Sequence, residues 1–378
     1  MIPRITIGGA ERDRGPGLRW VTSGLHLDPP LLVGALTVAA IGLTILYSAT
    51  DQDIQHVWHQ VLRLGIATVV MLVLAQVPPH FLKRITPAVF VTGMLLLIAV
   101  LIFGYTGKGA QRWLNLGFFR FQPAEMMKLA VPMMIAWYLD DKALPPNRLR
   151  LFIALVMILI PTALIAKQPD LGTALLVAGA GFFVLFLAGM RWRVIVALLL
   201  LSAALIPLLW HFMHGYQRQR VLIFLNPESD PLGAGYHIIQ SMIALGSGGL
   251  YGKGWLNGTQ SHLEFLPERS TDFILAVFGE EFGLFGILVL LALYLFIVVR
   301  GLYIATQAQT TYARLLGGAV ALTFFLYVFV NAGMVTGLLP VVGLPLPLVS
   351  YGGTSLVTIM AGFGILMSIH THRKLLPT

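Results

Sequence analysis

The stretch DFILAVFGEEFGLFGILVLLALYLFIVV, residues 272 to 299, decides the fold. A helix needs about 20 apolar residues to cross a bilayer, and this stretch supplies them with residues to spare. Its only charged side chains are Asp272 at the first position and Glu280 and Glu281 further in. Charged groups within a membrane span are costly, and they are functional candidates for that reason. The stretch therefore predicts a membrane-embedded chain in which three acids need an explanation.

The composition of the whole chain agrees with this interpretation. Of its 378 residues, 57% are hydrophobic and 11% are charged, whereas a soluble domain carries about a quarter charged residues. A soluble protein is therefore excluded. The formal charge of +9 is spread over the ends of apolar runs, so nucleic acid is not an expected partner. The absence of cysteine excludes disulfides, Cys-based metal sites and thiol nucleophiles.

Apolar runs of spanning length recur along the chain and predict an all-α, polytopic membrane protein with about ten transmembrane helices. We expect one transmembrane domain, residues 31–371, between an N-terminal tail of residues 1–30 and a C-terminal tail of residues 372–378. The one long connection is residues 213–271. The predicted spans are residues 31–48, 58–77, 85–104, 123–139, 149–167, 170–190, 194–212, 272–299, 314–337 and 353–371.

The charge distribution predicts the orientation of these spans. An even number of spans places both termini on the same side of the membrane. Most of the 25 Lys and Arg lie in short segments on that side. The positive-inside rule then places both tails in the cytoplasm and the long connection in the periplasm. The first apolar run has no cleavage site after it, so we interpret it as a retained anchor.

Ionisable side chains gather at one predicted depth. On this topology Glu125, Lys128, Lys167, Asp170 and Asp272 all lie at the outer ends of spans. This shared depth predicts one polar cavity that faces the outer side and is roofed by the long connection. One further cation, at position 63, lies within the second span.

Asp272 allows two interpretations. An acid in the first turn of a helix interacts favourably with the helix dipole, which is a purely structural role. A carboxylate at a membrane-embedded cavity mouth is also suited to act as a general base. Glu280 and Glu281 lie about 12–14 Å further along a helix and on other faces, so we interpret them as packing or polar-network residues.

Glu125 and Lys128 are three residues apart and share a helix face. They form either an internal ion pair or a site in which Lys128 reaches a phosphate while Glu125 orients it or helps to hold a cation. Upstream, Arg112 and Arg120 alternate with aromatic residues, which is typical of a segment in the membrane interface. The Gly-rich residues 246–255 do not form a phosphate-binding P-loop, because Lys253 is followed by Gly. No spacing of His, Asp and Glu specifies a metal.

Outer cations beside interfacial aromatics suit a substrate that carries phosphate at the headgroup and a long lipid tail. The chain contains no nucleotide motif, so the energy of any reaction must come from the substrate.

From about residue 49 to residue 374 the chain resembles the SEDS family of peptidoglycan glycosyltransferases. Its PVVGLPLPLVSYGG resembles the cell-elongation members more than the division members. The motifs that carry the resemblance are GKGAQRWLNLG, FQPAEMMKLAVP, QPDLGTALL, YQRQRVLIFLNPESDPLGAGYHIIQSMIALGSGGLYGKGW, EFLPERSTDFILAVFGEEFG and GLLPVVGLPLPLVSYGGTS.

The resemblance implies a ten-helix enzyme of the bacterial inner membrane that polymerises lipid II on the periplasmic side. The essential aspartate of the family falls on Asp272, and its conserved Glu and Lys fall on Glu125 and Lys128. A divalent cation, Mg²⁺ or Mn²⁺, is associated with the family. The implied partner is a class B penicillin-binding protein, a transpeptidase, within the elongation machinery.

The implied mechanism uses one base. Asp272 takes the proton from the 4-hydroxyl of the acceptor GlcNAc, and that oxygen attacks the lipid-linked MurNAc to form a β-1,4 bond. Undecaprenyl pyrophosphate leaves, and nearby cations stabilise its charge. The candidate substrate-binding residues are Glu125, Lys128, Arg112, Arg218, Arg220 and Asp170.

Two other classes of function compete with this hypothesis. A lipid II flippase would use the same cavity, and buried charges are equally typical of transporters. The chain shows no internal inverted repeat, however, and its charges lie at one depth rather than at the midplane. A scaffold that only positions a transpeptidase would not need the cluster of acids and bases.

Overall fold

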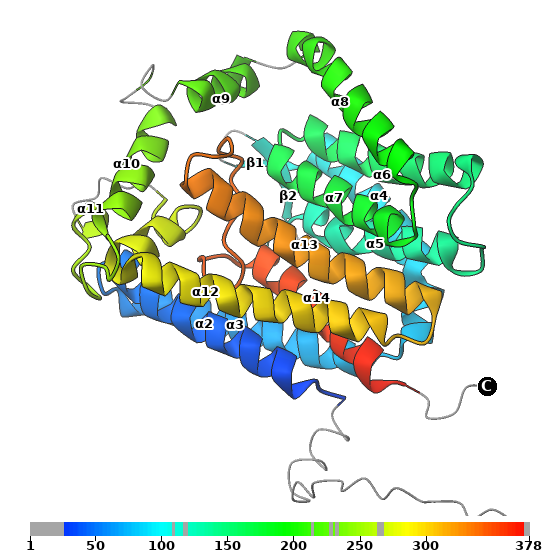
Figure 1. The fold of residues 1–378 in the computed structure, drawn as a ribbon, viewed down its shortest axis with the longest axis horizontal. Helices are drawn as coiled ribbons and strands as arrows, with labels where there is room; N and C mark the ends of the chain where they lie inside the picture. Colours follow the sequence, from blue (N-terminus) through cyan, green and yellow to red (C-terminus); the bar gives the residue numbers. More distant parts are fainter. Residues whose placement is uncertain are drawn as a thin grey trace, which may run out of the picture.

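The computed structural model describes residues 26–107, 110–115, 120–212, 215–226, 230, 234–262 and 268–373. Three short strands, β1 (Tyr105–Gly107), β2 (Ala110–Asn115) and β3 (Arg120–Phe121), form a small antiparallel sheet in the order β1-β2-β3. All other elements described are helices (Figure 1): α2 (Pro29–Ala49), α3 (Ile54–Gln76), α4 (Pro79–Phe103), α5 (Pro123–Asp140), α6 (Arg148–Lys167), α7 (Leu171–Leu187), α8 (Trp192–Phe212), α9 (Gly215–Leu225), α10 (Ala234–Ser247), α11 (Thr259–His262), α12 (Ile274–Thr306), α13 (Thr311–Val335) and α14 (Thr354–Thr371).

Each predicted span coincides with a helix, α2 to α8 and α12 to α14, so the prediction of an all-α polytopic fold is confirmed. Seven of the described helices are long and apolar enough to cross a membrane, and α7 and the first part of α8 are shorter apolar helices. The remaining span, α5, carries three charged side chains, and it packs against α4, α7 and α13 inside the bundle. Neighbouring helices therefore shield a span that is less apolar than the rest.

Short polar side chains start many of these helices. An oxygen of an N-cap side chain accepts a hydrogen bond from the first free backbone N–H groups and so satisfies one of them. Five of the spans begin in this way. The cap of α2 directly precedes two prolines, and the cap of α7 directly precedes the apolar run that starts at Leu171. The capping residues are Asp28 of α2, Asp53 of α3, Asn147 of α6, Asp170 of α7 and Thr310 of α13.

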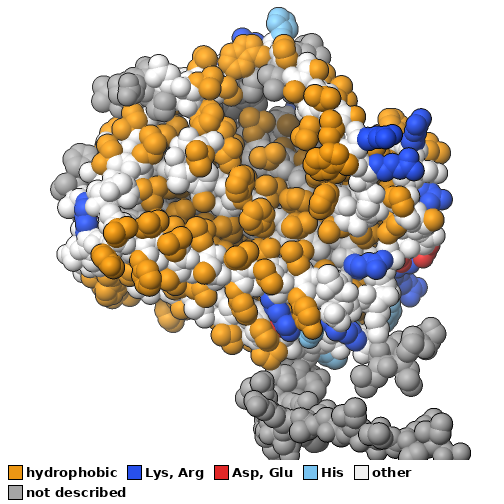
Figure 2. Space-filling model, in the orientation of Figure 1, with side chains coloured by type: hydrophobic (Ala, Val, Ile, Leu, Met, Phe, Trp, Pro, Cys, Tyr) orange, Lys and Arg blue, Asp and Glu red, His pale blue; other side chains and the backbone are white. Residues whose placement is uncertain are grey.

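The bundle has two distinct ends, which we call the terminal end and the loop end. At the terminal end His370 and Arg300 lie 3.4 Å and 2.6 Å from the carboxylate of Asp28, so both ends of the bundled chain meet there. The loop end holds the small sheet, α10 and the irregular residues 336–353 (Figure 1). Figure 2 shows hydrophobic side chains over most of one face and Lys and Arg gathered along the right-hand edge, at the terminal end.

Residues 336–353 form no helix, and the part of this segment from residue 344 to residue 350 lies largely inside the bundle. The helix that follows, α14, starts beside Arg63, which lies about 13 Å along α3 from its first residue. Leu344, Leu346 and Val349 of this segment are buried. Irregular backbone at membrane depth is tolerated only where it is covered by protein or lines a watery cavity. We therefore expect this segment to belong to a functional site, and not merely to connect α13 with α14.

Helix α12 is interrupted at Gly283, whose φ of 65° and ψ of −166° suit only glycine. The interruption leaves backbone groups of the helix without partners inside it. The loop that follows α10 supplies them: Leu284 and Phe285 donate to the carbonyls of residues 249 and 250, at 3.0 Å each. Lys253 N–H donates to the carbonyl of Glu280 at 3.0 Å. The loop thus holds the first part of α12 in place.

Candidate active site

Asp272 lies two residues before the start of α12, at the loop end, and is partly buried. The N-cap of α12 is Phe273, and no acid occupies its first turn, so Asp272 does not cap the helix. The backbone carbonyl of Asp272 accepts a hydrogen bond from the Asn331 amide at 2.9 Å. A Cβ at Gly343 would lie 3.5 Å from the Oδ2 of Asp272. The carboxylate therefore points toward the irregular segment 336–353.

The ion pair expected between Glu125 and Lys128 is present. Lys128 Nζ lies 2.6 Å from Glu125 Oε1 and donates a second hydrogen bond, at 2.5 Å, to the hydroxyl of Tyr327. The Lys128 side chain is only 2% exposed, and it lines a partly open pocket of about 30 Å³ together with Thr323 and Tyr327. Glu125 Oε2 has no hydrogen-bond partner in the described part of the chain.

Helix α13 connects this ion pair to Asp272. Tyr327 and Asn331 are four residues apart, so they lie on one face of α13 about one turn from each other. Tyr327 contacts Lys128, and Asn331 contacts the backbone of Asp272 and donates to the carbonyl of Leu344 at 2.7 Å. One turn of α13 thus fixes the distance between the acid and the buried ion pair.

Asp170 and Arg112 also meet at the loop end. Asp170 caps α7 by accepting from Thr173 N–H at 3.3 Å, and its Oδ2 accepts from Gln122 at 2.8 Å. Arg112, on β2, has Nη1 3.9 Å from Asp170 Oδ1 and donates to the carbonyl of Pro169. The sheet therefore presents a cation to the start of α7.

The irregular segment lies between Asp170 and Asp272. A Cβ at Gly172, two residues after Asp170, would lie 2.7 Å from the carbonyl of Val342, and the next residue of the segment, Gly343, faces Asp272. Arg112 and Asp170 thus lie at the start of α7, beside the segment that Asp272 faces, and Glu125 and Lys128 are connected to that segment through Tyr327 and Asn331 of α13. Their role in binding substrate stays a prediction.

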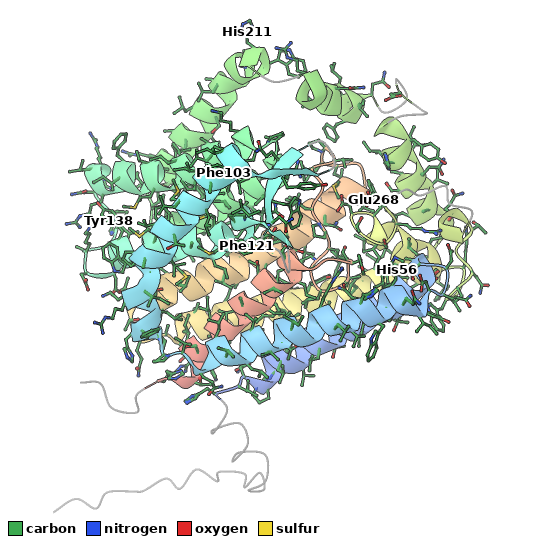
Figure 3. The ribbon with its side chains drawn as sticks, turned by 180° about the vertical axis from the view of Figure 1, so that it is seen from behind. His56, Phe103, Phe121, Tyr138, His211 and Glu268 are labelled. Carbon is green, nitrogen blue, oxygen red and sulfur yellow. The ribbon has the colours of Figure 1, made fainter. Side chains whose placement is uncertain are left out.

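The other predicted cations are placed differently. Arg218, on α9, donates to the carbonyls of Trp210 and His211 at 2.9 Å and 2.7 Å, which ties α9 to the end of α8. Figure 3 shows His211 at the far tip of the molecule, away from Phe121 next to α5. The side chain of Arg220 lies outside the described residues. Lys167 is exposed, and its neighbour Gln168 is the buried one, which donates to the carbonyl of Leu97 at 3.0 Å.

Sequence reasoning missed several residues that build this site. They are Gln122, Tyr327, Asn331, Ser350 and Tyr351. The last two fix the chain just before Asp272: the hydroxyl of Ser350 donates to the carbonyl of residue 271 at 2.6 Å, and the N–H of Tyr351 donates to the carbonyl of residue 270 at 2.8 Å. The usable signal was polar side chains four residues apart within the otherwise apolar span of α13.

Glu280 and Glu281 form a polar network, one of the two roles, packing or polar network, that the sequence predicted for them. Glu280 is fully buried, and its Oε1 accepts from Lys253 Nζ at 2.7 Å and from the N–H groups of Thr259 and Gln260 at 2.8 Å and 3.0 Å. Glu281 accepts a hydrogen bond from the hydroxyl of Ser48 on α2. The two acids therefore connect the first part of α12 to the loop after α10 and to α2.

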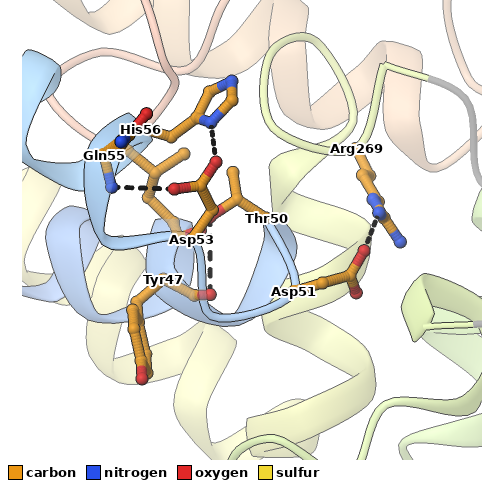
Figure 4. Close-up of polar contacts among 8 residues, drawn as sticks. Tyr47, Thr50, Asp51, Asp53, Gln55, His56 and Arg269 are labelled. Carbon is orange, nitrogen blue, oxygen red and sulfur yellow. Dashed lines mark hydrogen bonds and ion pairs between the residues drawn. The ribbon is translucent and has the colours of Figure 1, made fainter.

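The turn between α2 and α3 braces the same region (Figure 4). Arg269, three residues before Asp272, pairs with Asp51 in this turn. Asp53 accepts from His56 Nδ1 at 2.6 Å and from Gln55 N–H at 2.8 Å, and these contacts lower the pKa of Asp53. The residues just before Asp272 are thus held by the turn between α2 and α3 as well as by Ser350 and Tyr351.

No three His, Cys, Asp or Glu side chains among the described residues are arranged to hold a metal ion. The divalent cation that the resemblance implies stays a prediction.

The family model described as "Cell cycle protein", for FtsW, RodA and SpoVE, matches residues 29–375. The chain belongs to this family, the SEDS family. It is 57% identical to the peptidoglycan glycosyltransferase MrdB of Escherichia coli K12 over 353 residues, which cover 93% of this chain and 95% of that one. It is 36% identical to a probable peptidoglycan glycosyltransferase FtsW of Geobacter metallireducens, over 92% of this chain and 95% of the relative.

Solved structures of SEDS proteins share the fold. RodA of Thermus thermophilus, a rod shape determining protein, matches with a TM-score of 0.70 and 28% identity, over 92% of this chain and 98% of that chain. A chain from a peptidoglycan synthase complex that coordinates polymerization and crosslinking matches with a TM-score of 0.81 and 31% identity, over the same shares. The chain is therefore a polytopic helical membrane protein of the RodA type, as the sequence predicted.

Proposed function

We propose that this chain is a peptidoglycan glycosyltransferase that polymerises lipid II into β-1,4-linked glycan during cell elongation. The observation that carries the proposal is the position of Asp272. Its carboxylate faces the irregular segment 336–353, and hydrogen bonds from the side chains of Asn331 and Ser350 and from the N–H of Tyr351 to backbone carbonyls hold the chain around it. A fixed carboxylate at such a place is suited to general-base chemistry.

The reaction balances with this one base. The Asp272 carboxylate accepts the proton of the acceptor 4-hydroxyl, and the oxygen bonds to the anomeric carbon of MurNAc as the bond from that carbon to the diphosphate oxygen breaks. The configuration inverts, and undecaprenyl pyrophosphate leaves. A diphosphate is a good leaving group, so no second carboxylic acid needs to protonate it, in contrast to glycoside hydrolysis.

Cations near Asp272 support this step by stabilising the charge of the leaving group. Arg112 is one third exposed and lies beside the start of α7, so its guanidinium is within reach of a ligand at the loop end. Lys128 is buried in its ion pair, and we infer that it acts by shaping the site unless substrate displaces Glu125. Asp170 and Gln122 orient Arg112.

We infer the orientation from charge. Cations gather at the terminal end in Figure 2, and the positive-inside rule places that end, with both termini, in the cytoplasm of a bacterium with the chain in its inner membrane. The loop end and Asp272 then face the periplasm. A class B penicillin-binding protein is the proposed partner, and the likeness to a chain of a peptidoglycan synthase complex supports it.

The test is polymer synthesis by the purified chain in complex with its transpeptidase. Lipid II is added in detergent, and glycan strands are resolved by gel electrophoresis. We expect strands of many disaccharides. A folded complex that makes no polymer but moves labelled lipid II across vesicle membranes would instead be a flippase, and one that does neither would be a scaffold.

A further inference from the structure

Arg63 is a cation within the membrane span of α3. It lies about 13 Å along the helix from Ile54, and it is partly buried. Charged side chains at such depth usually pair with each other or with backbone carbonyls. The guanidinium of Arg63 makes no hydrogen bond and no ion pair within the described part of the chain. Its one contact of this kind is with the ring of Tyr351, whose centroid lies 4.2 Å from Cζ.

The ring under Arg63 is held firmly. Gln60, about one turn earlier on α3, donates to the carbonyl of Ser350 at 3.2 Å and accepts from Gly352 N–H at 3.4 Å. These two bonds flank Tyr351 in the sequence and fix its backbone against α3. A cation over a fixed aromatic face is stabilised, but the ring takes up none of the five N–H donors of the guanidinium.

The same backbone connects Arg63 to the site around Asp272. The N–H of Tyr351 donates to the carbonyl of Ser270 at 2.8 Å, and Ser350 donates to Thr271. Asp272 follows directly. The guanidinium of Arg63 therefore stacks on Tyr351, whose backbone is bonded to the segment directly before the proposed catalytic base.

Arg63 also lies at the border between protein and lipid. Its neighbours Leu62 and Ile66 are 50% and 60% exposed and face outward, whereas Gln60 is buried against the irregular segment. A ligand that reaches Arg63 from the lipid side needs a long apolar tail and a group that accepts several N–H donors. Phosphate meets the second requirement, because an arginine binds it through two parallel hydrogen bonds.

We propose that Arg63 binds the phosphate of a membrane lipid at the α3–α14 border. The inference rests on the proposed function for the favoured source, the polyprenyl diphosphate of the glycosyl donor or of the released carrier. A glycerophospholipid headgroup offers the same chemistry. In either case Arg63 is a binding residue, and it holds the anionic end of the lipid beside the segment that carries Asp272.

The test is binding to the full-length chain in complex with its transpeptidase, without turnover. The probes are undecaprenyl diphosphate, the uncharged alcohol undecaprenol, and phosphatidylglycerol, each titrated and detected by native mass spectrometry. The variants are Arg63→Gln and Arg63→Lys. Arg84→Gln, at an exposed cation near the start of α4, is the matched control, and thermal unfolding checks the fold of each.

We expect Arg63→Gln to weaken undecaprenyl diphosphate binding about 10- to 100-fold, the range for losing a charge-assisted hydrogen bond. Arg63→Lys keeps the charge but not the paired donors, so its loss should be smaller. Undecaprenol binding and the Arg84→Gln variant should be unchanged. A loss confined to phosphatidylglycerol would support the site and name the headgroup as its ligand. Unchanged binding of both phosphate lipids in Arg63→Lys and Arg63→Gln would overturn the proposal.

This test is independent of the chemistry at Asp272. Asp272→Asn should keep its affinity for undecaprenyl diphosphate even if it makes no polymer. Suppose that Arg63→Gln loses binding while Asp272→Asn still makes polymer. The phosphate site at Arg63 would then be supported, and only the assignment of Asp272 as the base would be wrong. If Arg63→Gln does not fold, Arg63→Lys alone decides, because it preserves the charge and the long stem.

Discussion

The side-chain amide of Asn331 donates to the backbone carbonyl of Asp272 at 2.9 Å and to that of Leu344 at 2.7 Å. One buried amide therefore holds the chain before α12 against the irregular segment that the Asp272 carboxylate faces. Tyr327, about one turn away on the same helix, holds Lys128. The position of the proposed base depends on α13 as much as on its own helix.

Replacing Asn331 with Ala should lower polymerisation by about tenfold or more, because a small displacement of a catalytic group is costly. It leaves two carbonyls without their donor, which should destabilise the fold by about 1–3 kcal/mol. Initial rates and thermal unfolding measure the two effects. Thr336→Val is the control, because the hydroxyl it removes bonds, among the described residues, to carbonyls in the last turn of α13 alone. A wild-type rate for Asn331→Ala would show that α13 does not position Asp272.

Replacing Glu280 with Ala removes a fully buried acceptor from Lys253 and from two backbone N–H groups, and it leaves Lys253 with the hydroxyl of Thr259 as its partner. Breaking a buried ion pair from one side usually costs about 3–5 kcal/mol. We expect a loss of that order in the free energy of unfolding. Lys253→Gln should cost less, because Lys253 is partly exposed and Gln still donates. Equal stability of Glu280→Ala and wild type would mean that the loop after α10 does not hold α12.

Replacing Gly252 with Ala should separate the loop after α10 from α12. Its φ is +79°, and a Cβ there would overlap the carbonyl of Glu281. Strain of this kind costs about 1–3 kcal/mol per residue. Gly65→Ala is the matched control, because a Cβ at Gly65 meets nothing within 4 Å. If both variants melted at the same temperature, the close contact between the backbones of Gly252 and Glu281 would not contribute to stability.

The imidazole of His237 on α10 stacks on Phe273 with ring centroids 5.9 Å apart. Burial lowers the pKa of His237, and the carboxylate of Glu268 opposes this in part. The folded chain thus binds fewer protons than the unfolded chain just below the ordinary pKa of about 6.5, so stability is present above that pH and is lost as pH falls. Melting temperatures between pH 5 and 7.5 should fall less on acidification in His237→Gln than in wild type. Parallel curves would show that the protonation of His237 does not contribute to the loss of stability at low pH.

The helices could be predicted from the sequence because each depends on its own residues. Apolar length gave the spans, and i, i+3 spacing gave the pair of Glu125 and Lys128. Tyr327 and Asn331 could not be assigned, because Lys128 and Asp272, the partners that tie them to the site, lie more than 50 residues away and their contacts depend on how α13 packs. The interruption at Gly283 was missed for a similar reason, since a glycine in an apolar run indicates close packing unless the loop that fills the gap is known.

The small sheet was also missed. Its alternating cations and rings were interpreted as an interfacial segment, and the structure pairs them as strands that bring Arg112 to Asp170. Arg218 was predicted to bind substrate because it is a cation in the long outer connection and in a motif that carries the resemblance. Its described contacts are with backbone carbonyls at the end of α8.

The most direct measurement is the initial rate of glycan polymerisation from lipid II by the purified complex carrying Asp272→Asn. The variant keeps the shape of the side chain and the backbone bond to Asn331, but it cannot accept the proton. A general base contributes about 10²–10⁴-fold to a rate, so we expect a fall of at least about 100-fold with unchanged thermal stability and unchanged lipid II binding. Polymerisation by Asp272→Asn at the wild-type rate would contradict the assignment of Asp272 as the base.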